Sequence, residues 1–184
     1  MQQGPPALGR WTISATPMNQ ALQILLLWLV LQAAVTDLAI RRIPNVLVLS
    51  GLLIAAVLHW RVGTPMALCE TWLAGLASGF FLFLPLYLLR GMAAGDVKLM
   101  AMTGAFVGPA MAVHIALVTC LAGGVLGIGM VVLSGRWAVL WHNLRALGLA
   151  ALRHTAAVTI TRDTSAGGIP YGVAIALGTA FVVL

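Results

Sequence analysis

The chain has very little charge and almost no acid. Only 8% of its 184 residues are charged, and only four of these are Asp or Glu, against ten Lys and Arg. Hydrophobic residues make up 61% of the chain and the mean hydropathy is +1.04. A water-soluble core of this length cannot bury so much apolar surface. The composition therefore excludes an ordinary soluble domain and predicts an integral membrane protein.

Cysteine is equally scarce. Cys69 and Cys120 are the only two in the sequence, and both lie in apolar stretches. Two cysteines cannot supply the four ligands of a structural zinc site, and the four histidines show no spacing typical of metal ligands. We therefore expect neither a metal nor another cofactor.

The apolar residues are concentrated in stretches that predict transmembrane helices. They lie at residues 18–36, 46–60, 67–89, 97–107, 109–133 and 169–184. A helix needs about 20 residues to cross ~30 Å of hydrocarbon, so the stretch at 97–107 reaches only about half of that thickness. That helix should begin near Ala93, lie beside a water-filled recess, or both. We expect an all-α polytopic membrane protein with about six transmembrane helices and one amphipathic interfacial helix.

The remaining segments are assigned from their polarity. Residues 1–17 form a polar tail, and residues 18–184 form a single membrane-embedded domain. Within that domain, residues 136–154 have the pattern of an amphipathic helix on the inner leaflet, and residues 155–168 form a polar linker. The alternative, in which 136–154 crosses the membrane, is costly because polar and charged residues lie in its middle.

The distribution of basic residues predicts the orientation. With six spans and the amino terminus outside, eight of the ten Lys and Arg lie on the inner side. This agrees with the positive-inside rule. The net charge of +6 then follows from membrane topology, and no nucleic-acid partner is expected.

Two of the four acids should lie at the same membrane face. Asp37 stands at the end of the first span and Asp96 at the start of the fourth. Two crossings separate them, so the chain returns to the inner face between one acid and the other. Two close carboxylates in a partly dry site cannot both ionise cheaply, so one keeps a proton and the pair can serve as base and acid. This is the chemistry by which water hydrolyses a peptide bond without a metal.

The same residues allow simpler interpretations. Asp37 could pair with Arg41, four residues later, in the favourable order for a helical ion pair. Asp96 could be the N-cap of a helix that begins at Val97. A proton-coupled membrane transporter or a non-catalytic pilus or secretion assembly subunit would also be compatible with two acids in a membrane protein.

Three motifs resemble one known family. "DLAIRRIPN" at residues 37–45 and "GMAAGDVKL" at residues 91–99 resemble the two aspartate motifs of the type IV prepilin peptidases, which are intramembrane aspartyl proteases of the GxGD type. "IPYGVAIALG" at residues 169–178 resembles the last helix of that family. The order and spacing are most similar to the small Tad-type members, which have no methyltransferase or zinc domain.

The resemblance implies an aspartic endopeptidase with Asp37 and Asp96 as its catalytic pair. Its partners would be a pilin-like (Flp/Tad) precursor protein and membrane lipid, and the sequence leaves the oligomeric state open. It would be a multi-pass protein of the bacterial inner membrane that removes leader peptides at the cytoplasmic face. The precursor would have a short basic leader, a glycine at the cut, and a long apolar helix.

Residues beside the two acids are expected to position the backbone or bind substrate. These residues are Gly95, Ala93, Ala94, Lys98, Pro44 and Asn45. Ala93 occupies a position where the family motif has glycine, a change that is harmless if the backbone is helical but costly at positive φ or at a very close approach to a neighbour or substrate. Gly95 is expected to let the backbone turn tightly into Asp96. Lys98 is either an interfacial anchor or a cation that favours ionisation of Asp96.

Overall fold

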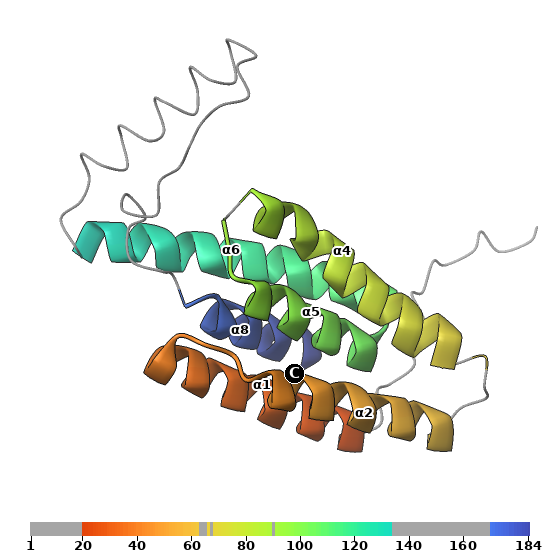
Figure 1. The fold of residues 1–184 in the computed structure, drawn as a ribbon. Coiled ribbons are helices and arrows are strands. Elements are labelled where there is room, and N and C mark those ends of the chain that lie inside the picture. Colours follow the sequence, from red (N-terminus) through yellow and green to blue (C-terminus); the bar gives the residue numbers. More distant parts are fainter. Residues whose placement is uncertain (1–19, 63–65, 67, 90, 134–169) are drawn as a thin grey trace, which may run out of the picture.

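The computed structural model describes residues 20–62, 66, 68–89, 91–133 and 170–184 of the chain. Their regular elements are all helical and lie side by side in one bundle (Figure 1). In chain order they are α1 (Gln20–Ile40), α2 (Asn45–Val62), a short π-helical segment η1 (Leu68–Leu73), α4 (Ala74–Leu88), α5 (Ala94–Val107), α6 (Pro109–Leu133) and α8 (Tyr171–Val183). The predicted polar tail, interfacial helix and linker lie outside the described residues.

The all-α prediction is confirmed, and three of the expected spans are supported by length and composition. Residues Gln20–Ile40, Leu68–Leu88 and Pro109–Met130 are each long and apolar enough to cross a membrane. Helices Asn45–Arg61 and Tyr171–Val183 are apolar but shorter. The chain thus has the apolar helices of a membrane protein, and the count of about six crossings stays a prediction.

Helix α5 lies at the centre of the bundle. Eleven of its fourteen residues are buried, and it packs against α1, α2, α4, α6 and α8. A helix of this length extends only about 21 Å, less than the hydrocarbon thickness. Because other helices rather than lipid surround α5, it does not need the length of a lipid-exposed span. It begins at Ala94, close to the start near Ala93 that the sequence predicts.

Glycines bring α4 and α5 into direct backbone contact. A side chain at Gly75 would overlap the carbonyl group of Gly104, and one at Gly79 would overlap the carbonyl oxygen of Met100. Small residues at such positions allow helices to approach closely within a membrane. The position of α5 is therefore set largely by backbone packing against α4.

The carboxyl end of α5 is capped from two sides. Gly108, between α5 and α6, has φ +81°, a conformation that glycine adopts readily, and its N–H donates to the Gly104 carbonyl at 2.8 Å. The Nε2 atom of His59 on α2 lies 3.2 Å from the Ala105 carbonyl oxygen. Pro109, four residues after Ala105, has no N–H to offer that oxygen. These contacts fix the end of α5 opposite Asp96.

Candidate active site

Asp37 lies in the last turn of α1 with its side chain turned into the bundle. The residue is 8% exposed, although its neighbours at 38–42 are exposed. Its Oδ2 atom accepts a hydrogen bond of 2.8 Å from the backbone N–H of Gly172, the second residue of α8. A carboxylate that is buried next to the amino end of another helix is stabilised by that N–H group and by the helix dipole.

The proposed pairing of Asp37 with Arg41 is not found among the described residues. Arg41 is exposed and has φ 50°, which ends α1, and its backbone N–H donates to the Asp37 carbonyl at 2.9 Å. The contact between these residues therefore joins main-chain atoms. The Asp37 carboxylate bonds to α8 instead.

Asp96 is the third residue of α5 and is 5% exposed. Its Oδ2 atom accepts a hydrogen bond of 3.1 Å from the backbone N–H of Ala93. The N-cap position belongs to Ala93, so the alternative in which Asp96 caps a helix beginning at Val97 is wrong. Asp96 instead reaches back to the N-cap residue, as the acid in a capping box does.

The two acids come together at one end of the bundle. The end of α1 and the starts of α5 and α8 lie there, as Figure 1 shows. The carboxylates of Asp37 and Asp96 are close enough to interact electrostatically. The segments around them also meet, because a side chain at Gly95 would lie 3.3 Å from Cβ of Ile43. Two motifs far apart in the sequence therefore form one site.

The backbone at Ala93 readily accommodates alanine. The residue has φ −82° and ψ 154°, an extended conformation, and it is exposed. Neither positive φ nor a close approach requires glycine there. The neighbouring Ala94 is the first residue of α5 and is also exposed. The expected tight turn at Gly95 is wrong, since Gly95 lies within the first turn of α5 and its missing side chain leaves room for Ile43.

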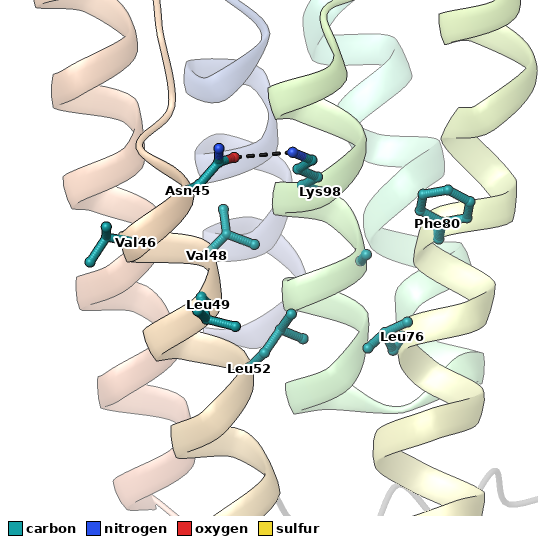
Figure 2. Close-up of a pocket in the computed structure, with 9 residues that line it drawn as sticks. Asn45, Val46, Val48, Leu49, Leu52, Leu76, Phe80 and Lys98 are labelled. Carbon is teal, nitrogen blue, oxygen red and sulfur yellow. Dashed lines mark hydrogen bonds between the residues drawn. The ribbon is translucent and has the colours of Figure 1, made fainter.

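Lys98 faces away from Asp96. The two residues are two positions apart on α5, and residues at that spacing do not face each other. Lys98 Nζ donates a 3.1 Å hydrogen bond to Oδ1 of Asn45 (Figure 2). Both lie at one end of an apolar groove between α2, α4 and α5. Pro44 immediately precedes Asn45 and α2, and proline suits the start of a helix. Lys98 thus links α5 to the start of α2.

Comparison with known families identifies the chain. The profile of the type IV leader peptidase family matches residues 24–128, more than half of the sequence. The chain belongs to this family. The matched region contains both Asp37 and Asp96, and membership makes the protein a leader peptidase-like protease of the aspartic type. Comparisons with curated proteins and with solved structures give no significant match.

The start of α8 brings two further residues to the acids of this leader peptidase. Gly172 bonds Asp37, and the half-buried Tyr171 is close enough to Asp96 for an electrostatic interaction. Tyr171 and Gly172 lie in the segment at 169–178 that resembles the family's last helix, but the sequence alone does not single them out as site residues. The available signal was the Pro-Tyr-Gly sequence directly before an apolar stretch.

The site's chemistry rests on carboxylates and main-chain groups. Among the residues that the structure describes, no three His, Cys, Asp or Glu side chains are grouped so that they could bind a metal ion. The groups brought together are two buried carboxylates, each accepting a hydrogen bond from a backbone N–H. Such an arrangement can transfer protons to and from a water molecule and a peptide.

Proposed function

We propose that this leader peptidase is an intramembrane aspartyl endopeptidase that cleaves leader peptides from type IV pilin-like precursors of the Flp/Tad class. Asp37 and Asp96 would be its catalytic pair. The observation that carries the proposal is the burial of both acids, within electrostatic reach of each other, inside the region that matches the family.

The mechanism proposed uses the two acids in complementary roles. One carboxylate takes a proton from water as the water oxygen attacks the peptide carbonyl carbon. The other, protonated, carboxyl group donates its proton to the carbonyl oxygen. As the tetrahedral intermediate collapses, the carboxyl group that took the proton from water gives it to the leaving nitrogen and the C–N bond breaks. The other carboxylate takes a proton from a hydroxyl of the intermediate, which restores the starting state. Two adjacent carboxylates in a desolvated site favour one shared proton, which is the starting state that this chemistry needs.

The proposed membrane location follows from topology and charge. Asp37, Asp96 and the start of α8 lie at the same end of the bundle. The positive-inside rule assigns that end to the cytoplasmic face of the bacterial inner membrane. A precursor whose basic leader stays in the cytoplasm and whose apolar helix stays in the bilayer would bring its scissile bond to this depth.

The Flp/Tad assignment rests on sequence resemblance. Two cysteines cannot form the paired-cysteine zinc site of the larger prepilin peptidases. We therefore propose cleavage without a metal.

The proposal is tested by incubating the purified protein in lipid with a Flp-type precursor and analysing the products by mass spectrometry. The expected result is a single cut at the leader junction by the wild-type protein and none by Asp37→Asn or Asp96→Asn. Glu70→Gln is the matched control, because Glu70 is exposed on η1 and should be dispensable. Cleavage by either asparagine variant at the wild-type rate would contradict the catalytic pair. No cleavage by the folded wild-type protein would contradict the peptidase proposal and favour a transporter or a non-catalytic assembly subunit.

A further inference from the structure

Helices α1 and α8 are joined by hydrogen bonds at both ends. Near the start of α1, the Gln23 side chain donates to the Val183 carbonyl at the end of α8. Near the end of α1, the Asp37 carboxylate accepts from the Gly172 N–H at the start of α8. The two contacts are fourteen residues apart on α1, which corresponds to about 21 Å of helix. They fix how far α1 can slide along α8, and with it the position of Asp37.

The contact at the active-site end is buried and leaves no free space. A methyl group at Gly172 would lie 2.8 Å from Oδ2, 2.9 Å from Cβ and 3.1 Å from Cγ of Asp37. The Cβ atom is bonded directly to the backbone and does not move when the Asp37 side chain rotates, so rotation alone cannot clear the overlap. The carboxylate of Asp37 occupies the space that any other residue at 172 would fill.

The donor is one of the N–H groups that a helix cannot satisfy internally. Gly172 is the second residue of α8, and the first four N–H groups of a helix have no partner within it. In this bundle the partner comes from α1, 135 positions away in the sequence. The hydrogen bond thus satisfies a free N–H group at the start of α8 and orients one oxygen of Asp37 at the same time.

We propose that Gly172 is a positioning residue of the active site. Its N–H orients the Asp37 carboxylate toward Asp96, and its missing side chain leaves the space that the carboxylate needs. This inference rests on the proposed catalytic role of Asp37. It makes the start of α8 a third component of the site, beside the two aspartate motifs.

Replacement of Gly172 by alanine tests the inference through kinetics. We expect Gly172→Ala to lower kcat on the order of 100-fold, since a displacement of about 1 Å in a catalytic group costs that much. KM should stay within about twofold, because a loss confined to the reacting geometry lowers kcat without weakening substrate binding. Rates are expressed per folded enzyme, from the folded fraction measured by size-exclusion chromatography.

Gly178→Ala is the matched control on the same helix. A side chain at Gly178 would meet the hydroxyl and backbone N of Thr119 on α6, so this variant disturbs α8 packing without reaching Asp37. We expect it to lower the Tm while leaving kcat per folded enzyme within about twofold of wild type. An unchanged kcat in Gly172→Ala, or an equal loss in both variants, would overturn the inference.

A second measurement does not require Gly172→Ala to fold. In protein labelled with ¹⁵N-glycine, the Gly172 amide proton should move upfield when Asp37→Ala removes its acceptor, while the Gly178 resonance stays in place. An unmoved Gly172 resonance overturns the positioning role alone. Wild-type cleavage by Asp37→Asn would instead overturn the proposed function, so the two failures are distinguishable.

Discussion

Replacing Ala93 by glycine restores the residue that the family motif has at this position, and we expect it to change little. Glycine would be required if the backbone had positive φ or if another group lay against Cα. Ala93 has φ −82° and ψ 154° and is exposed, so neither condition applies. The Asp96 carboxylate contacts the Ala93 N–H, which glycine retains.

The magnitude follows from two opposing effects. Glycine loses more conformational entropy on folding than alanine, a cost of roughly 0.5–1 kcal/mol. Ala93 is also the N-cap of α5, where glycine is preferred over alanine by a similar amount. The free energy of unfolding should therefore change by no more than about 0.5 kcal/mol. This corresponds to a Tm shift of at most about 2 °C for a chain of this size.

The assay compares wild type and Ala93→Gly in precursor cleavage and in thermal unfolding in the same detergent. We expect kcat and KM within about twofold of wild type. A tenfold rise in kcat would refute the reasoning, because it would show that alanine at this position impairs the site in a way that its backbone geometry does not predict.

Two further predictions concern the ends of helices. His59→Phe keeps a ring but leaves the buried Ala105 carbonyl without its partner, so it should lower the free energy of unfolding by about 1–3 kcal/mol. The control in thermal unfolding is His114→Phe, because the His114 ring contacts the Ala110 carbonyl, which lies inside a helix. Equal Tm values for the two variants would contradict this prediction. Arg41→Gly removes a side chain from a residue at φ 50° and should raise stability by about 0.5–1 kcal/mol, which a lowered Tm would contradict.

Much of the fold could be predicted because apolar runs in a membrane protein correspond closely to helices. The stretch at 109–133 coincides with α6, and the stretch at 67–89 covers η1 and α4. The π-helical segment Leu68–Leu73 could not be predicted, since it lies within the same apolar stretch as the helix that follows. The burial of α5 depends on the helices packed around it, which no local pattern in the sequence records. The short length of its apolar stretch is the one feature of the sequence that indicates it.

The site was partly predictable for a similar reason. Counting crossings is enough to predict that Asp37 and Asp96 share a face, because an even number of spans returns the chain to the same side. The bond between Asp37 and Gly172 depends on how α1 and α8 are placed against each other, and no local pattern records that placement. The sequence therefore does not reveal that Gly172 bonds Asp37, and the tight turn that it predicts at Gly95 is instead the first turn of α5.

The central claim is that Asp37 and Asp96 act as one catalytic unit. The measurement that tests it most directly is kcat/KM for precursor cleavage by Asp37→Asn, Asp96→Asn and the double variant, with each protein shown to be folded. Residues that act as a unit are strongly non-additive, so both single variants and the double variant should fall to the same residual level. A single variant that keeps wild-type activity, or losses that simply multiply in the double variant, would contradict the account.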